Sequence, residues 1–448
     1  MIFNELSFLI FLFLVLAAYD ILGKRHRTTL LLAASYYFYM SIIPAYGILL
    51  AATSVSTYYL AKKAANKDRK ALYAGIIINL SILIVYKYGY FIQWNIALVR
   101  YLFTSQWPEA FLMIVLPIGI SFYTFQALGY LIDAYNGKIK PADDLKRFLL
   151  FISFFPQLVA GPIERSYNML PQLKDLTRPK DGNVSEGVFL MLWGYFKKLV
   201  IADNIAFFVE RIFNYEYFGI MGIIGGFLFG IQIYCDFSGY TDIARGVALL
   251  FNIRLSINFN NPYLAENAID FWRRWHITLS TWFRDYLYIP LGGSRSGPTK
   301  TFYNIIIVFF IIGAWHGANW TFILWGLYFG ILVAFSHLVR YRSRLLTLAQ
   351  VIFGWVIFRA QSITQLVQII TGYAQPLKLS VFLWDGSLTL ITLLLSATLI
   401  TFWIEKNHWQ ERYHEGRTLV KLAACILLAS LILYYGNPLV VPFVYFQF

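Results

Sequence analysis

The sequence predicts an all-α polytopic integral membrane protein. Of its 448 residues, 59% are hydrophobic and only 13% are charged, and the mean hydropathy is +0.59. A soluble domain carries about 25% charged residues. Apolar runs long enough to cross a bilayer recur along the chain, and a backbone in lipid must satisfy its own polar groups, as a helix does.

The positive charge fits the same class. Lys and Arg number 37 against 23 acids, a net charge of +14, and membrane proteins concentrate basic residues in cytoplasmic loops. No stacking module, zinc finger or basic tail supports binding to nucleic acid. Cys235 and Cys425 lie far apart in apolar stretches, so we expect neither a disulfide framework nor a metal site.

Basic clusters set the expected topology of the first half. Leu6–Leu22 is a retained first span rather than a cleaved signal, and the basic residues 24–27 that follow place the N-terminus outside. Thr28–Leu60 is a hairpin between two basic clusters, Ala71–Ile92 crosses outward and Leu112–Ala134 returns. Phe148–Ile163 contains Pro156, Gly161 and Pro162, which predicts a re-entrant segment buried in protein. A basic loop at Ser166–Ser185 follows.

Charged residues interrupt the next two apolar segments. Gly187–Phe208 carries Lys197 and Lys198. These lysines are either functional intramembrane charges or snorkelling side chains, and the sequence favours neither. Phe218–Tyr234 leads into a stretch in which Asp236, Tyr240 and Asp242 stand close together; we expect them to face protein rather than lipid.

The run Asn258–Gly293 gathers charge, aromatic side chains and a histidine. Three- and four-residue spacing predicts one helix from about Ala268 to Tyr288. One stripe of this helix carries Phe271, Trp275, Leu279, Trp282 and Tyr286, and a second line carries Trp272, His276 and Ser280. An equally good interpretation is an amphipathic helix at the membrane surface, with Arg273, Arg274 and Arg284 toward lipid phosphates.

A second histidine, His316, is predicted deep in the membrane. Phe302–Ala314 and Thr321–Val339 lie between two basic loops, which requires a helical hairpin. A helix starting near Lys300 rises about 22 Å over about 15 residues, in a hydrocarbon core about 30 Å thick. His316 would then lie at a glycine-flanked turn, far from the loops.

The remaining segments complete the predicted architecture. Leu345–Gly372 crosses outward, Phe382–Ile404 returns to a mixed-charge loop at Glu405–Arg417, and Leu419–Tyr435 exits, leaving Gly436–Phe448 as an extracytoplasmic tail. We expect roughly eleven or twelve membrane segments, some of them re-entrant. They would form a single domain over residues 1–448.

Several motifs resemble those of the membrane-bound O-acyltransferase family. FWRRWHITLSTWFRDYLYIPLGG (271–293) and GAWHGANW (313–320) match its signature pair, and Leu116–Ile139, Phe154–Arg165 and Tyr234–Gly246 extend the match. The resemblance is to the bacterial branch of alginate and peptidoglycan O-acetyltransferases, with the core signature at 116–330. It implies helices around a central tunnel and a location in the bacterial cytoplasmic membrane.

The resemblance also implies site residues. His316 matches the family's catalytic histidine, and His276 takes a catalytic or a supporting role. A buried histidine is otherwise more often a satisfied core residue, and no ligand set for haem or metal accompanies this pair. An imidazole can take the acceptor's proton. Possible oxyanion donors are Trp315, Asn319 and Trp320.

Charged residues have expected roles as well. Asp236 or Asp285 is a candidate for orienting a histidine. The basic face with Arg273, Arg274 and Arg284 could attract the phosphates of coenzyme A, and anionic lipid would satisfy these arginines equally well.

The chain ends in F-x-Y-x-x-F, with Tyr445 as its tyrosine. The motif resembles the C-terminus of a small partner protein in teichoic-acid D-alanylation, where the tyrosine is proposed to carry the acyl group; an aromatic anchor at the interface is the alternative. The family then implies acetyl transfer from cytoplasmic acetyl-CoA through an acetyl-tyrosine to an extracytoplasmic SGNH-hydrolase-like transferase and an envelope polysaccharide. D-alanyl transfer and a non-catalytic transporter remain alternatives.

Overall fold

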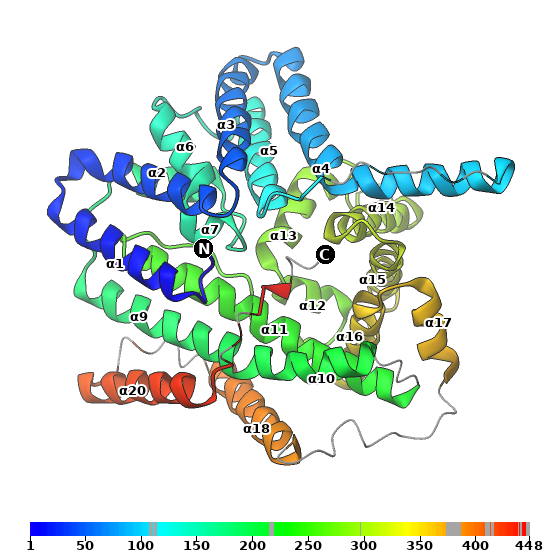
Figure 1. Ribbon diagram of the computed structural model, residues 1–448. Helices are drawn as coiled ribbons and strands as arrows, with labels where there is room; N and C mark the ends of the chain where they lie inside the picture. The colour runs from blue at the N-terminus through cyan, green and yellow to red at the C-terminus, as the bar shows by residue number, and fades with distance from the viewer. Residues whose placement is uncertain are drawn as a thin grey trace. The chain divides into compact units, whose positions relative to one another are not determined.

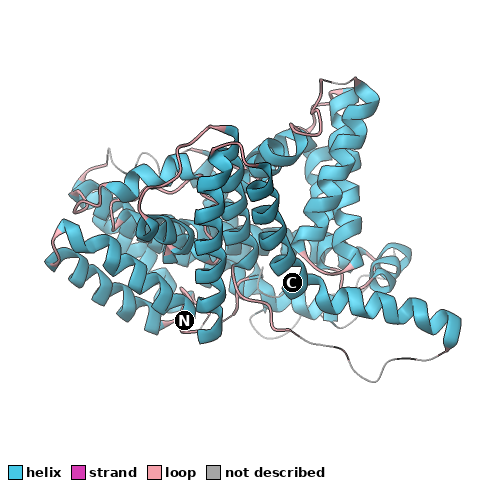
Figure 2. Ribbon diagram, turned by 90° about the horizontal axis from the view of Figure 1, so that it is seen from above, coloured by secondary structure: helices cyan, strands magenta, loops and turns pink. Residues whose placement is uncertain are grey.

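The computed structural model describes residues 1–105, 107, 111, 114–214, 219–295, 297–372, 387–407, 413, 416–437, 439 and 441–444. Over these residues the secondary structure is helical, with no strand (Figure 2). They group into two compact units. Unit 1 holds Met1, Ser7–Arg178 and Gly317–Asn319, and unit 2 holds Ile2–Leu6, Pro179–His316 and Trp320–Phe448.

Unit 1 contains the first eight helices. They are α1 (Leu6–Ile21), α2 (Lys24–Met40), α3 (Pro44–Ala65), α4 (Arg69–Thr104), α5 (Ile120–Asn136), α6 (Leu145–Ser153), α7 (Phe155–Leu158) and α8 (Ser166–Lys174). The predicted hairpin at 28–60 is α2 and α3, and Pro44 starts α3 where its missing N–H costs nothing. The helix is interrupted at Phe154, between α6 and α7 and two residues before Pro156. This interruption lies inside the segment predicted as re-entrant. The basic loop expected at 166–185 is instead helical over α8, because Met169 and Leu173 are buried on its inner face.

Unit 2 carries the rest of the chain, and Figure 1 labels most of its helices. The first part is α9 (Asp181–Tyr195), the π-helical segment η1 (Phe196–Ala202), α10 (Asp203–Asn214), α11 (Ile220–Leu249), the 3₁₀ turn η2 (Pro262–Leu264), α12 (Ala268–Arg274), α13 (Ile277–Phe283) and the π-helical η3 (Arg284–Tyr288). The second part is α14 (Pro298–His316), α15 (Trp320–Val339), α16 (Arg344–Arg359), α17 (Ile363–Thr371), α18 (Ser387–Lys406) and α20 (Thr418–Tyr435).

Glycines lie at two close helix crossings of unit 2. A Cβ atom on Gly239 of α11 would lie 2.7 Å from the carbonyl oxygen of Gly194 on α9. A Cβ atom on Gly326 of α15 would lie 2.9 Å from Cα of Gly313 on α14. Small residues let helix backbones approach closely in a membrane, where packing rather than the hydrophobic effect drives association. These crossings fix α11 and α14, the two helices that carry much of the site.

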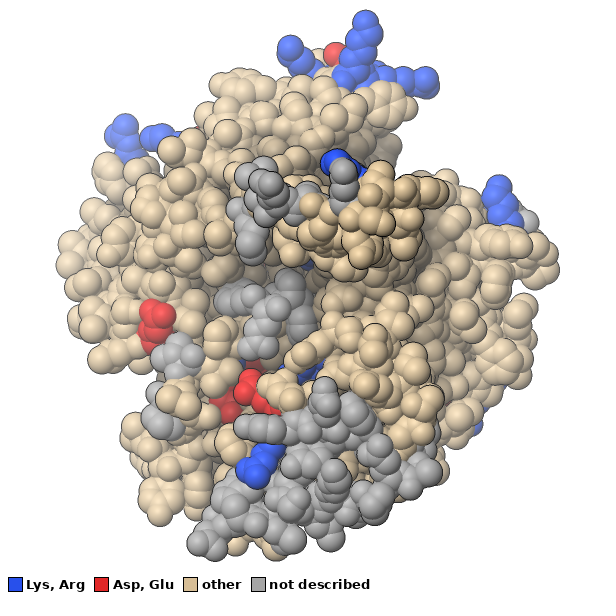
Figure 3. All heavy atoms as spheres, turned by 45° about the vertical axis from the view of Figure 1, so that its right-hand side comes forward, with Lys and Arg blue, Asp and Glu red and all other residues tan. Residues whose placement is uncertain are grey.

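The all-α polytopic class is confirmed. Six helices in the described part of the chain are long and apolar enough to span a membrane: Arg69–Thr104, Ile220–Leu249, Pro298–His316, Trp320–Val339, Leu388–Lys406 and Thr418–Tyr435. The face in Figure 3 is largely neither acidic nor basic, as a lipid-facing surface requires. The larger number of membrane segments and the single domain expected from the sequence stay predictions.

Candidate active site

His316 is the last residue of α14, at the turn into α15. The predicted hairpin is therefore confirmed. The imidazole is 4% exposed and lies in an aromatic shell, with its ring centre 4.7 Å from that of Trp325, 4.9 Å from Trp315 and 5.3 Å from Phe358. This packing fixes the ring and excludes bulk water from it.

The helix predicted from Ala268 to Tyr288 is broken at His276. α12 ends at Arg274, α13 begins at Ile277, and His276 has a left-handed backbone with φ +42°. The break is stabilised by the extended segment before it: Asn260 N–H donates to the Arg274 carbonyl (3.0 Å), and Ile277 N–H donates to the Asn258 carbonyl (2.9 Å). The prediction of one continuous helix was wrong because these distant backbone groups replace the helical hydrogen bonds.

The break places His276 beside the residues around His316. The His276 ring centre lies 4.7 Å from Phe237 and 6.1 Å from Trp315, which itself lies 4.9 Å from His316. His276, in the connection between α12 and α13, is fully buried. Burial disfavours the imidazolium and lowers the pKa of His276 to about 3. The ring is therefore neutral at pH 7, a form that can accept as well as donate a proton.

A buried ionic cluster lies on the same unit. Lys197 pairs with Asp242 (2.7 Å) and Glu405 (2.9 Å), and Lys198 pairs with Asp203 (2.8 Å) and Asp236 (2.7 Å). Both lysines are at most 2% exposed, so the snorkelling interpretation is wrong. Charges buried this deeply persist only when each has a partner.

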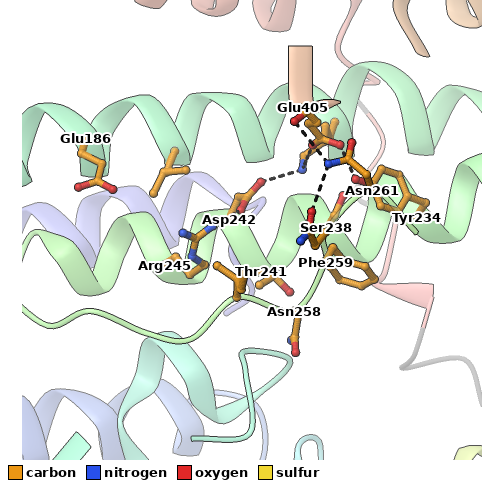
Figure 4. Close-up of a pocket in the computed structure, with 14 residues that line it drawn as sticks. Glu186, Tyr234, Ser238, Thr241, Asp242, Arg245, Asn258, Phe259, Asn261 and Glu405 are labelled. Atoms are coloured by element: carbon orange, nitrogen blue, oxygen red, sulfur yellow. Dashed lines mark hydrogen bonds and ion pairs between the residues drawn. The ribbon is translucent and has the colours of Figure 1, made fainter. Parts of the chain in front are cut away.

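The pairing of Glu405 was not predicted from the sequence, in which this residue begins a mixed-charge loop. The residue lies in the last turn of α18, and its carboxylate also accepts from Trp193 Nε1 (3.3 Å) and the Tyr234 hydroxyl. Figure 4 shows Glu405, Asp242 and Tyr234 around a polar pocket of about 50 Å³, which has room for one or two waters. Asn258 also lines the pocket, and its backbone carbonyl accepts the Ile277 N–H hydrogen bond at the helix break next to His276.

The end of the described chain is held by this cluster. Val444 N–H donates to Asp236 Oδ2 (2.7 Å), and the Phe443 ring stacks on Tyr240 at 4.8 Å. The Tyr240 ring also stacks with the Phe3 ring, and their ring centres lie 4.6 Å apart. We call Asp236, Phe237 and Tyr240 the tail seat, because each contacts Phe443 or Val444. Phe237 also contacts His276. Tyr445, the residue after Val444, lies outside the described residues.

We expect Asp236→Ala to release the tail. Removing an ionised acceptor costs about 1.5–3 kcal/mol, so maleimide should label a cysteine introduced at Val444 about tenfold faster or more. The background carries Cys425→Ser and keeps Cys235, which is fully buried and reports any unfolding. Val444→Pro removes the donor N–H, and it also fixes φ at this residue and restricts Phe443. It should release the tail likewise, seen as faster labelling of a cysteine introduced at Val441. Unchanged labelling in both variants would show that the tail seat does not hold the tail.

The other predicted residues divide into buried and exposed groups. Trp275, a candidate tunnel or supporting residue, is 1% exposed and packs on Trp355, with ring centres 4.8 Å apart. Trp320 begins α15 and is 45% exposed, and Asn319 lies in the preceding turn. Arg274 pairs with Asp270, and Arg284 with Asp285, both at 2.8 Å.

Comparison with known proteins decides the family. The model of the membrane-bound O-acyltransferase family, MBOAT, matches residues 142–367, which include the break at His276 and the turn at His316. The chain belongs to this family. It is therefore an O-acyltransferase and a multi-pass membrane protein, as the motifs predicted.

Named relatives of this O-acyltransferase include two kinds of O-acetylating protein. Probable alginate O-acetylase AlgI of Pseudomonas aeruginosa is 36% identical over 382 residues, 81% of this chain and 73% of the relative. Peptidoglycan O-acetyltransferase of Helicobacter pylori is 38% identical over 391 residues, 76% of this chain and 72% of the relative. Teichoic acid D-alanyltransferase of Bacillus subtilis is 30% identical over 227 residues, 48% of this chain and 58% of the relative.

Proposed function

We propose that this O-acyltransferase takes an acetyl group from cytoplasmic acetyl-CoA and transfers it across the membrane for O-acetylation of an envelope polysaccharide, alginate-like or peptidoglycan. The observation that carries the proposal is the tail seat. It holds Val444, the neighbour of Tyr445, by its backbone N–H, and it includes Phe237, which touches His276. The described chain thus ends one residue before Tyr445, at a seat that contacts His276, and this supports Tyr445 as the proposed acyl acceptor.

In the proposed step His316 takes the proton of the Tyr445 hydroxyl as the phenol oxygen attacks the thioester carbonyl. The carbon–sulfur bond breaks, and the proton passes from the imidazole to the leaving thiolate, so that acetyl-tyrosine and free thiol result. Indole N–H groups around the histidine, that of Trp315 first among them, are the donors for the oxyanion. The neutral His276 fits a supporting role, as a second donor or acceptor beside Trp315.

Acetyl-tyrosine suits a relay. The reference pKa of a phenol is about 10, so it is a far better leaving group than a sugar hydroxyl. The acetyl group would pass from Tyr445 to an extracytoplasmic transferase resembling SGNH hydrolases, and from there to the polysaccharide. This direction requires the C-terminal tail to face outward, in the orientation predicted for both termini from the basic loops.

Two other functions compete with acetyl transfer. D-alanyl transfer to teichoic acid is favoured less, because that relative aligns with 48% of this chain against 81% for the alginate protein. A transporter would use buried charges such as Lys197 and Lys198 without chemistry.

Label transfer separates the enzyme from a transporter. Purified full-length protein incubated with acetyl-CoA labelled in its acetyl group should acquire protein-bound label that survives denaturation. A parallel incubation with a D-alanyl thioester should leave the protein unlabelled. Complete absence of label from acetyl-CoA would refute the acetyl-enzyme and favour transport.

A further inference from the structure

A polar pocket of about 480 Å³ lies between α12 and the end of α15. Four arginines line it: Arg273, Arg274, Arg340 and Arg342. Arg274 is neutralised by Asp270 (2.8 Å), and the pocket's other acid, Glu266, pairs with Arg344 (3.4 Å). The remaining three guanidiniums have no carboxylate partner in the described part of the chain, so the pocket keeps an uncompensated positive charge.

The turn that carries two of these arginines is fixed in place. Arg340 adopts a left-handed backbone, φ +53°, which turns the chain away from α15. Ser343 N–H then donates to the Glu266 carbonyl (2.8 Å), and its hydroxyl caps α16 by accepting from Leu346 N–H (3.3 Å). Arg340 and Arg342 are therefore presented from an ordered turn, close to Arg273 on α12.

An apolar cavity of about 440 Å³ adjoins this pocket and shares Ile269 and Arg273 with it. Its wall includes Val308 and Ile312 of α14, but it also carries the hydroxyls of Ser280 and Thr281. Trp272 lines it as well, is 7% exposed, and has an indole N–H without a hydrogen-bond partner among the described residues. A buried donor left unpaired is costly, so this N–H marks a place where a ligand acceptor fits.

The cavity ends one layer of side chains from the catalytic candidate. The Trp272 ring centre lies 5.6 Å from that of Trp325, and Trp325 lies 4.7 Å from His316. Trp272 and Trp325 therefore link the cavity wall to the imidazole.

We infer that the paired pockets bind the acyl donor, with its phosphorylated nucleotide at Arg273, Arg340 and Arg342 and its pantetheine arm in the cavity. The inference rests on the proposed function and names the donor site within it. Three free guanidiniums suit a pyrophosphate and a further phosphate. A pantetheine amide carbonyl can accept from the Trp272 N–H, which a lipid acyl chain would leave unpaired. The Ser280 and Thr281 hydroxyls donate to the Trp275 and Thr278 carbonyls, so their oxygens can accept from a pantetheine N–H. Pockets of this size are typical for ligands of that class.

The experiment measures binding to the purified full-length protein with two probes, coenzyme A and adenosine 3′,5′-bisphosphate. An Arg340→Gln/Arg342→Gln double variant should weaken both probes about tenfold or more, because charge-assisted hydrogen bonds are lost. Trp272→Phe keeps an aromatic side chain, although a smaller one, and removes the indole N–H, so it should weaken coenzyme A and leave the bisphosphate unchanged. Lys300→Gln, a loss of charge in the first turn of α14, is the matched control and should change neither affinity.

Three results would overturn the assignment. One is unchanged affinity for both probes in the double variant. Another is equal loss in Lys300→Gln, which would reduce the effect to general charge. The third result comes from binding measurements in nanodiscs that contain phosphatidylglycerol or only phosphatidylcholine. If the double variant loses binding of phosphatidylglycerol but keeps its affinity for coenzyme A, the arginines hold a lipid phosphate. Failure of label to reach Tyr445 while the arginine-dependent affinity persists would refute the relay and leave the donor site standing.

Discussion

Replacing His316 with alanine should lower the rate of acetyl transfer by about 10²- to 10⁴-fold, the contribution typical of a positioned general base. The imidazole is 4% exposed within a shell of Trp315, Trp325 and Phe358, so no solvent base can take its place. The measurement is the initial rate of label transfer from acetyl-CoA to the purified protein at saturating donor.

His26→Ala is the matched control, because His26 is an exposed histidine in the first turn of α2. It should transfer acetyl at the rate of the unmodified protein. Binding of coenzyme A should persist in His316→Ala, since His316 does not line the pockets assigned to the donor. A His316→Ala protein that binds coenzyme A and still transfers acetyl within tenfold of the normal rate would remove His316 from the mechanism.

Replacing Tyr445 with phenylalanine should abolish protein-bound label altogether. The change deletes only the phenol oxygen that is proposed to form the ester and keeps the aromatic ring of the F-x-Y-x-x-F motif. Since Val444 donates its backbone N–H to Asp236, the substitution leaves the tail seat intact. Intact-mass measurement after incubation with acetyl-CoA reports the result.

Tyr434→Phe supplies the control, because Tyr434 is an 80% exposed tyrosine near the end of α20. It should keep full labelling. Label that persists in Tyr445→Phe would mean that the acetyl group is carried elsewhere or that the motif is only an aromatic anchor.

The sequence was sufficient for the fold class and for the hairpin that carries His316. Both depend on local patterns: long apolar runs predict membrane helices, and the glycines that flank His316 after such a run predict the turn. The break at His276 was not predictable in this way. A non-glycine residue at φ +42° depends on hydrogen bonds to Asn258 and Asn260, which periodicity does not report.

Long-range pairing explains the other differences. The charged residues around Glu405 predicted a loop, yet Glu405 pairs with Lys197, which lies 208 residues earlier in the sequence. The basic face was assigned to Arg273, Arg274 and Arg284 because they share one segment. The structure shows that two of these pair with Asp270 and Asp285, and that Arg340 and Arg342 join Arg273 instead. Whether a charge is free depends on its neighbours in space, which a single sequence does not give.

The most direct test of the relay is to locate the acetyl group after one turnover. Full-length protein and its His316→Ala variant are mixed with acetyl-CoA, quenched with acid and digested, and the C-terminal peptide is sequenced by mass spectrometry. The relay predicts an acetyl group on Tyr445 in the unmodified protein and an unmodified peptide in the variant. Acetyl on any other residue, or equal acetylation of Tyr445 in both proteins, would contradict it.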